Sequence, residues 1–403
     1  MKTKFSKGEY MKRTVKDLVG LKGKVVLLRV DFNVPIDDTG RILDTTRIVN
    51  ALPTIKYLIK QKARVVLLSH LDRPKGYDVR KSLWPIAMML MKALPCNVDF
   101  SNTVIGEEAK GRIANLKEGN VLLLENTRFY DGETECDMNF AREIASMGDI
   151  FVNDAFGSAH RKNASTFGLA RLLPNAMGLL MQKEVNGLAK TIEEPKHPFV
   201  AVLGGAKVNT KINILKKFIE KADVVIIGGA MAYTFLEADG IPVGSSLVDD
   251  KCLDIAAEIL DYADEVGKKV LLPVDHIAVS ESDRRQQVVL CKRLRGDLVG
   301  YDIGPETINR YVREIAKAKQ IFWNGPMGMF EDDRFVHGTA MIANAIAKSS
   351  AYTVVGGGDT VNALNRMGLT KSVNFISTGG GATMEYLEKG TLPCIDVIQD
   401  KII

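Results

Sequence analysis

Lys24-Val-Val-Leu-Leu-Arg29-Val-Asp31-Phe-Asn33 is a short apolar run that passes directly into charged and amide side chains. Two later runs in the first half of the chain end in the same way, Val65-Val-Leu-Leu-Ser-His70-Leu-Asp-Arg73 and Val121-Leu-Leu-Leu-Glu-Asn-Thr-Arg128. Runs in the second half end in glycine instead: Phe199-Val-Ala-Val-Leu-Gly204-Gly205-Ala-Lys207, Val224-Val-Ile-Ile-Gly228-Gly229 and Thr353-Val-Val-Gly356-Gly-Gly-Asp359-Thr360. Ligands of open α/β sheets bind beyond the carboxyl ends of the strands. The sequence therefore predicts an anion pocket of side chains in one half and a backbone cradle for phosphates in the other, which is typical of a transferase.

Such β-branched runs alternate with amphipathic segments of helical length along the whole chain. In the first half we expect strands at Lys24–Val30, Arg64–Ser69, Asn97–Phe100, Val121–Glu125 and Asp149–Asn153, and helices at Thr46–Lys62, Leu83–Ala93 and Asp137–Met147. Pro53 should kink or shorten the first helix. In the second half we expect strands at Phe199–Leu203, Asp223–Ile227, Lys269–Leu272, Gln320–Trp323, Tyr352–Val355 and Asn374–Ser377. This alternation predicts an α/β fold with parallel sheets that are covered by helices on both faces.

The length of 403 residues exceeds what one core usually supports, so we expect two domains. Leu172-Leu-Pro174-Asn175 is a turn signal, and Met181–Glu194 reads as a polar helix that stops at Pro195. We predict an N-terminal domain at 1–180, a connecting hinge helix at 181–195 and a C-terminal domain at 196–392. The tail at 393–403 is apolar enough to dock, and residues 1–10 read as a loosely held tail.

Composition excludes several classes of protein. The net charge of +5 comes without a dense Lys/Arg stripe, so we expect no nucleic-acid partner. No apolar run approaches the roughly 18 residues of a membrane span, and the N-terminus lacks the apolar region of a signal peptide. The five cysteines are scattered and never form a C-x-x-C motif, which indicates reduced thiols in a cytoplasmic protein.

The glycine turns of the second half favour a nucleotide site. Gly356-Gly-Gly-Asp359-Thr360 follows a strand and precedes a helical stretch, and Thr378-Gly-Gly-Gly381 repeats the pattern one strand later. Asp359 could cap the helix or hold Mg²⁺ beside phosphates. Lys207 and Lys211 would share one helix face if a helix began there. The alternatives, ordinary tight turns and solvated surface lysines, stay open on pattern alone.

A side-chain cluster marks the first half, with every member just past an apolar run or at a turn: Asp31, Asn33, Arg47, His70, Arg73, Arg128 and Arg161. Converging arginines fit a small polyanion. A dehydrogenase should carry a G-x-G-x-x-G fingerprint, and the chain has none after its first strand; it also lacks a P-loop. A non-catalytic nucleotide-binding protein would have no need for the arginine cluster.

Motifs spread over nearly the whole chain resemble the signature segments of phosphoglycerate kinases, in family order. They are Arg29-Val-Asp-Phe-Asn-Val-Pro35, Ser69-His-Leu-Asp-Arg-Pro-Lys-Gly76, Glu125-Asn-Thr-Arg-Phe129, Asn153-Asp-Ala-Phe-Gly-Ser-Ala-His-Arg161, Gly204-Gly-Ala-Lys-Val208, Trp323-Asn-Gly-Pro-Met-Gly328, Gly356-Gly-Gly-Asp-Thr360 and Ser377-Thr-Gly-Gly-Gly381.

The resemblance implies two Rossmann-like domains, a C-terminal tail that packs back on the N-terminal one, and a cytoplasmic monomer of glycolysis. It implies reversible transfer of the acyl phosphate of 1,3-bisphosphoglycerate to MgADP, which gives 3-phosphoglycerate and MgATP. By motif position the phosphoglycerate would be bound by the side-chain cluster of the first half. The nucleotide would be held by Lys207, Lys211, Gly300, Asn324, Glu331, Gly357, Gly358, Asp359 and Thr360, with Asp359 on Mg²⁺.

Three segments depart from the family pattern. Asp72 stands where the His-Leu-x-Arg-Pro motif usually has glycine, which adds a negative charge near the expected anion pocket. Asn209-Thr210 precede Lys211 where an acidic residue is usual, and Leu298-Val299-Gly300-Tyr301 matches the adenine-side segment only loosely.

The expected chemistry needs no general base, because an ADP phosphate oxygen and a carboxylate are both ionised at neutral pH. Catalysis then consists of positioning and of neutralising charge on the phosphoryl group in flight. Arg47 and Lys207 are the residues we expect in that neutralising role. Because in-line transfer needs close, dry reactants, we expect hinge closure between the domains.

Overall fold

The computed structural model describes residues 12–209, 211–282 and 287–401, so the expected N-terminal tail and Thr210 lie outside the described part. The chain forms two compact units, each with its own parallel sheet. Unit 1 comprises the described residues up to Asn186 together with those from Thr391 onward, and unit 2 comprises Gly187–Gly390. No helix in the described ranges is long and apolar enough to cross a membrane.

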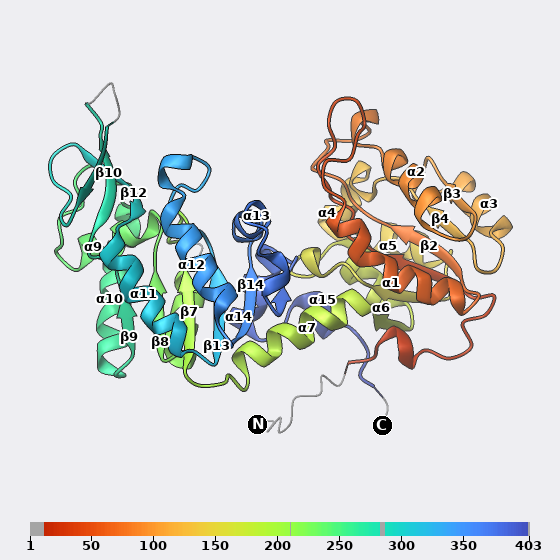
Figure 1. Ribbon diagram of the computed structural model, residues 1–403. Coiled ribbons are helices and arrows are strands. Elements are labelled where there is room, and N and C mark those ends of the chain that lie inside the picture. The colour runs from red at the N-terminus through yellow and green to blue at the C-terminus, as the bar shows by residue number, and fades with distance from the viewer. Residues whose placement is uncertain (1–11, 210, 283–286, 402–403) are drawn as a thin grey trace. The chain divides into compact units, whose positions relative to one another are not determined.

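The sheet of unit 1 has six parallel strands in the order β3-β4-β2-β1-β5-β6. Its strands are β1 (Val25–Arg29), β2 (Arg64–Leu68), β3 (Val98–Phe100), β4 (Val121–Leu123), β5 (Ile150–Asn153) and β6 (Asn175–Met177) (Figure 1). The five expected strands are confirmed. The sixth, β6, was missed because it is short and directly follows the turn signal at Pro174.

Helices cover both faces of this sheet. Val26 and Leu28 of β1 belong to one core with side chains of α1 (Thr46–Lys60) and α2 (Trp84–Ala93). Val25 and Leu27 belong to a second core with α3 (Glu107–Asn115) and α5 (Met138–Ala145). The remaining helices of the unit are α4 (Asp131–Glu135), α6 (Leu169–Leu172) and α15 (Pro393–Asp396). Pro53 lies inside α1, and the helix continues past it to Lys60.

The parallel sheet of unit 2 has the order β15-β14-β13-β7-β8-β9. Its strands are β7 (Phe199–Leu203), β8 (Val224–Ile227), β9 (Lys269–Leu271), β13 (Gln320–Asn324), β14 (Tyr352–Gly356) and β15 (Phe375–Ile376), and all had been expected (Figure 1). Phe218 packs against Phe199 and Phe322. Val200 and Val202 share a core with α11–α13. The helices are α8 (Ile212–Lys221), α9 (Met231–Ala238), α10 (Leu253–Glu265), α11 (Pro305–Lys317), α12 (His337–Lys348), α13 (Gly358–Arg366) and α14 (Gly381–Lys389).

A small antiparallel sheet in unit 2 was not expected from the sequence. It consists of β10 (His276–Ser280), β11 (Val288–Cys291) and β12 (Leu298–Ile303), in the order β11-β10-β12. Its strands follow one another along the chain without helices between them. The alternation of strands and helices that predicted the parallel strands is therefore missing here, and these strands could not be predicted in the same way.

Helix α7 (Leu179–Ile192) carries the chain from unit 1 into unit 2, and the division falls between Asn186 and Gly187. At its start, the backbone N–H groups of Leu180 and Met181 donate to Asp154 Oδ1 at 2.9 and 3.0 Å. Near its end, the carbonyl of Thr191 accepts from Gln320 Nε2 at 3.1 Å. Each end of the helix is thus anchored within its own unit.

Candidate functional site

The side-chain cluster of unit 1 lies at one edge of its sheet. Because the strands run parallel, the segments that follow β1, β2, β4 and β5 all leave at that edge. Asp31 and Asn33 follow β1, His70 and Arg73 follow β2, Arg128 follows β4 and Arg161 follows β5, while Arg47 is in the first turn of α1. The structure therefore places every cluster residue predicted from the sequence at the expected edge.

Direct contacts join several members of this cluster. Arg47 Nη1 donates to Asp31 Oδ1 at 2.9 Å, and the backbone N–H of Asn33 donates to the same oxygen at 3.1 Å. Asn33 Oδ1 accepts from the backbone N–H of Asp72 at 2.8 Å, and Arg128 Nη1 donates to the Asp72 carbonyl at 2.5 Å. Segments from three different strand ends are therefore held together by the protein's own contacts.

The electrostatics of this edge favour an anion. Burial, and then the nearby charges of Arg161, Arg29 and Arg73, lower the pKa of Arg128 to about 10. Burial also holds the pKa of His70 well below its ordinary value, although Asp31 opposes the shift. These arginines repel one another across a partly buried surface. A polyanionic ligand would relieve that repulsion.

The negative charge of Asp72 is paired with a neighbouring lysine. The backbone φ of 56° at Asp72 lies in the left-handed region, which explains why the family motif has glycine here, and Asp is one of the few other residues that adopt this conformation. Its carboxylate pairs with Lys81 at 2.5 Å, and that hydrogen bond lowers the pKa of Asp72. Lys81 therefore offsets the charge that Asp72 brings to this loop.

In unit 2 the glycine turns converge where the strand order reverses, between β7 and β13. Gly204 N–H donates to the Asn324 carbonyl at 2.9 Å, and Gly205 N–H donates to the Pro326 carbonyl at 3.0 Å. A Cβ on Gly325 would collide with the Gly204 carbonyl, so the two turns can approach this closely only as glycines.

Lys211 lies at the same point. Its ammonium donates to the carbonyl of Gly204 and, at 3.3 Å, to that of Asn324. Burial lowers the pKa of Lys211 to about 8, with Asp359 opposing the shift. The helix that would have put Lys207 and Lys211 on one face does not include them, because α8 begins only at Ile212. Lys207 is exposed in the preceding loop.

The turn before α13 presents backbone N–H groups at a helix N-terminus. Gly357, with φ 93°, is the N-cap residue, Gly358 is the first helical residue and Asp359 the second. The helix-cap interpretation of Asp359 is therefore wrong. Its carboxylate is exposed near Lys211, and a Cβ on Gly358 would meet open space. This turn has the form of a phosphate-binding helix N-terminus.

Asn324 and Thr360 hold the turns in place. Asn324 Nδ2 donates to the Gly356 carbonyl at 2.8 Å, and Thr360 Oγ1 accepts from the Gly325 N–H at 2.6 Å. Both side chains are buried. Their hydrogen bonds join the turn after β13 to the turn after β14.

Two further predicted nucleotide-binding residues of unit 2, Gly300 and Glu331, lie on β12 and in the loop after β13. Gly300 is inside β12, its N–H donates to Ser246 Oγ at 3.0 Å, and a Cβ there would collide with the Tyr233 hydroxyl. The next residue, Tyr301, accepts from the N–H of Met329 at 2.9 Å, which ties β12 to the loop that leads to the exposed Glu331. Within the described ranges, no hydrogen bond joins Gly300 or Glu331 to Lys211 or Asp359.

In the part of the chain that the structure describes, no group of three or more His, Cys, Asp or Glu side chains could hold a metal by itself. An all-protein cage is not what Mg²⁺ requires, because it is usually bound by one or two carboxylates together with substrate phosphates. The exposed carboxylate of Asp359 beside the glycine turn fits that kind of site.

Arg29 is a member of the site that sequence reasoning did not select. It ends β1 and is only 1% exposed. Its guanidinium contacts His70 at 2.9 Å. Its position in the sequence could have identified it, because it is the first charged residue after the apolar run that forms β1.

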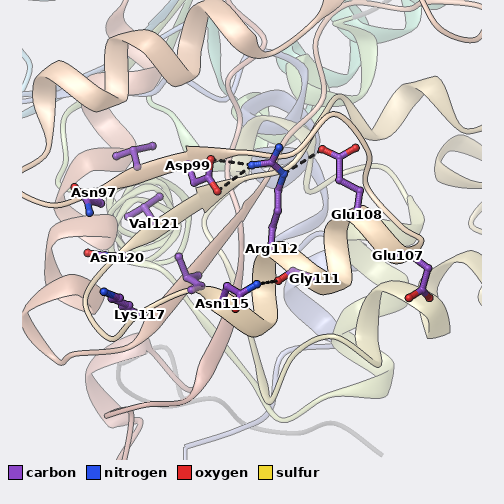
Figure 2. A pocket seen from close by; sticks show the side chains of 12 residues that line it. Asn97, Asp99, Glu107, Glu108, Gly111, Arg112, Asn115, Lys117, Asn120 and Val121 are labelled. Carbon is purple, nitrogen blue, oxygen red and sulfur yellow. Dashed lines mark hydrogen bonds and ion pairs between the residues drawn. The ribbon is translucent and has the colours of Figure 1, made fainter.

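A hollow lies elsewhere on unit 1, beside the amino ends of β3 and β4 (Figure 2). Figure 2 shows Arg112 between Asp99 and Glu108, which it contacts at 3.1 Å each. Arg112 is thus neutralised by these two carboxylates, and the segments that leave the carboxyl ends of the strands are absent from the lining. This hollow is therefore not the candidate site.

Comparisons with known proteins agree on one family. The family model described as phosphoglycerate kinase matches residues 15–390. A curated phosphoglycerate kinase of Pseudothermotoga lettingae is 48% identical over 394 residues, which cover 97% of this chain and 99% of the relative. That of Aquifex aeolicus is 46% identical over 393 residues, with 97% and 99% covered. The solved phosphoglycerate kinase of Coxiella burnetii matches with a TM-score of 0.88 at 40% identity, covering 96% of this chain and 98% of that one. That of Pyrococcus horikoshii OT3 matches with a TM-score of 0.83 at 33% identity, with the same coverage.

Proposed function

The chain belongs to the phosphoglycerate kinase family, glycolytic enzymes that transfer the acyl phosphate of 1,3-bisphosphoglycerate reversibly to ADP, and we propose that its two sheet edges divide this reaction between them. Unit 1 binds the phosphoglycerate and unit 2 binds the nucleotide. The observation that carries this proposal is the contrast between the edges, cationic side chains at one and glycine turns with a helix N-terminus at the other.

The phosphoglycerate is bound by the side-chain cluster of unit 1. Three arginines close enough to influence one another, Arg73, Arg128 and Arg161, suit the phosphate farthest from the reacting centre. Asp31 orients Arg47 through their 2.9 Å contact, and Asn33 supports the loop that carries Arg73. His70 contributes a neutral hydrogen-bonding group.

The nucleotide is bound at the turns of unit 2. Backbone N–H groups at Gly357 and Gly358 and the ammonium groups of Lys207 and Lys211 meet its phosphates, and Asp359 would hold Mg²⁺. Asn324 and Thr360 preserve the cradle, while Gly300 and Glu331 lie on the nucleoside side. When bound, Mg²⁺ would neutralise charge on the phosphates.

Transfer proceeds in line and without a general base, because both possible nucleophiles are already ionised at neutral pH. The chain contributes positioning and positive charge, with Arg47 and Lys207 next to the phosphoryl group in flight. Reacting atoms must come within roughly 3–3.5 Å of each other, and water must be kept from the acyl phosphate. Closure about α7 when both ligands are bound would meet both demands.

The enzyme acts as a monomer in the cytoplasm. Both sets of groups that the reaction needs are on one chain, and all five cysteines are free, which suits a reducing compartment.

A coupled assay tests the activity directly. Purified protein should form ATP from 1,3-bisphosphoglycerate and MgADP, and should bind 3-phosphoglycerate and MgADP separately. A protein that binds the nucleotide but neither binds 3-phosphoglycerate nor forms ATP would contradict the proposal.

A further inference from the structure

We propose that Arg29 is a positioning residue, which fixes the proton of the His70 imidazole on Nε2 so that this N–H donates to an anionic oxygen of the phosphoglycerate. The inference rests on the proposed function, because His70 belongs to the cluster assigned to that ligand.

Arg29 is a buried hub at the carboxyl end of β1. Its Nε donates to Ser165 Oγ at 2.7 Å, its Nη1 donates to the Val30 carbonyl, and its Nη2 lies 2.9 Å from His70 Nδ1. The side chains of Arg29 and His70 are 1% and 3% exposed, so water competes little for this contact.

The contact determines the tautomer of His70. A guanidinium has only N–H groups and cannot accept a hydrogen bond, so His70 Nδ1 must accept with its lone pair. In a neutral imidazole the proton then resides on Nε2. The imidazolium would place an N–H against the guanidinium, and burial together with the neighbouring arginines already holds the pKa of His70 well below its ordinary value.

A second set of contacts holds Arg29 itself. Ser165 Oγ accepts from Arg29 and donates to Glu133 Oε1 at 2.6 Å, and the Ser165 N–H donates to Glu133 Oε2 at 2.9 Å. Glu133 Oε1 also lies 3.7 Å from Arg29 Nη2. Each of the three guanidinium nitrogens of Arg29 thus has a hydrogen-bond partner, and the carboxylate of Glu133 balances the buried positive charge.

The remaining donor of His70 has a role in binding. Among the described residues, only Arg29 is hydrogen-bonded to the His70 ring, which leaves Nε2–H available to a ligand oxygen. A neutral N–H donor can orient the bound ligand through a directional hydrogen bond, and it adds no further positive charge to a cluster of arginines. In the opposite tautomer, the lone pair of Nε2 would face the anion and repel it.

Nuclear magnetic resonance of protein labelled with ¹⁵N-histidine tests the tautomer in the whole enzyme. The chain has five histidines, and His70→Gln assigns the resonance of His70 by its loss. We expect His70 to carry its proton on Nε2 and to remain neutral at neutral pH. A proton on Nδ1, or an imidazolium at neutral pH, would overturn the proposal. In Arg29→Met the ring should lose its single tautomer, provided that circular dichroism shows a folded protein.

A matched pair of variants tests the donor. The amide of glutamine reaches the position of Nε2, whereas that of asparagine reaches only the position of Nδ1. His70→Gln should keep the KM for 3-phosphoglycerate within a few-fold, and His70→Asn should raise it about 10- to 100-fold, with the KM for MgATP unchanged in both. Equal increases in both variants would overturn donation from Nε2. If neither variant changes KM while the expected tautomer is observed, His70 does not contact the substrate. That result would reject the donation and the assignment of His70 to the ligand, while the rest of the proposed function would stand.

Discussion

Binding of MgADP should take up protons at Lys211 when the pH is near 8. Burial lowers the pKa of this ammonium to about 8 in the free protein, and Asp359 is the one carboxylate that opposes the shift. The phosphates of a bound nucleotide would return the pKa to at least the ordinary lysine value of about 10.4, because an adjacent negative charge favours the charged form.

The expected uptake follows from these two values. In the free protein the ammonium is about 90% protonated at pH 7, about 50% at pH 8 and about 10% at pH 9, whereas in the complex it is nearly fully protonated. Binding should therefore take up about 0.1, 0.5 and 0.9 protons at these pH values, and the affinity should fall as the pH rises.

Isothermal titration calorimetry in buffers of different ionisation enthalpy measures this uptake. Lys211→Arg keeps the positive charge at every pH and should abolish the uptake, whereas Lys207→Met, which removes the exposed lysine of the same loop, should retain it. Wild-type protein with no uptake at pH 8–9, or Lys211→Arg with the same uptake as wild type, would refute the reasoning.

Three further predictions concern the chemistry, the metal and the motion. Arg47→Ala should lower kcat by about 10²-fold or more, as the loss of a transition-state donor does; a raised KM with kcat preserved would make Arg47 an ordinary substrate anchor. Asp359→Asn should weaken binding of MgADP far more than binding of metal-free ADP, and equal losses in titrations with and without Mg²⁺ would argue against a metal ligand. Small-angle scattering should give a smaller radius of gyration in the ternary complex than in the free protein or in either binary complex, and an unchanged radius in all four states would contradict closure.

Patterns repeated along the chain made both parallel sheets predictable, with the exception of the short strand β6. Strands such as β7 and β14 are buried apolar runs that end in glycine, so their length and their ends could be read directly. The antiparallel strands β10–β12 have no crossover helix between them, and β11 is largely exposed. Neither strand–helix alternation nor a buried apolar run therefore marked them in the sequence.

The sequence predicted at which edge of each sheet the site residues lie, but it did not predict which side chains contact one another. Strand order brings His70 and Arg128 to one edge, but only the folded loop reveals that Asp72 adopts φ 56° and turns its carboxylate to Lys81. Lys211 illustrates the same limit, because its carbonyl acceptors are 7 and 113 positions away in the chain. Periodicity describes local geometry, whereas these contacts depend on tertiary packing.

Hydrogen–deuterium exchange tests most directly the central claim that each unit binds its own ligand. With 3-phosphoglycerate alone, protection should increase in the segments that carry Asp31, His70, Arg128 and Arg161. With MgADP alone, it should increase in the turns at Gly204–Gly205 and Gly356–Thr360 and at the start of α13. Protection by both ligands in the same unit, or by either ligand in the opposite unit, would contradict the division of the reaction between the two sheet edges.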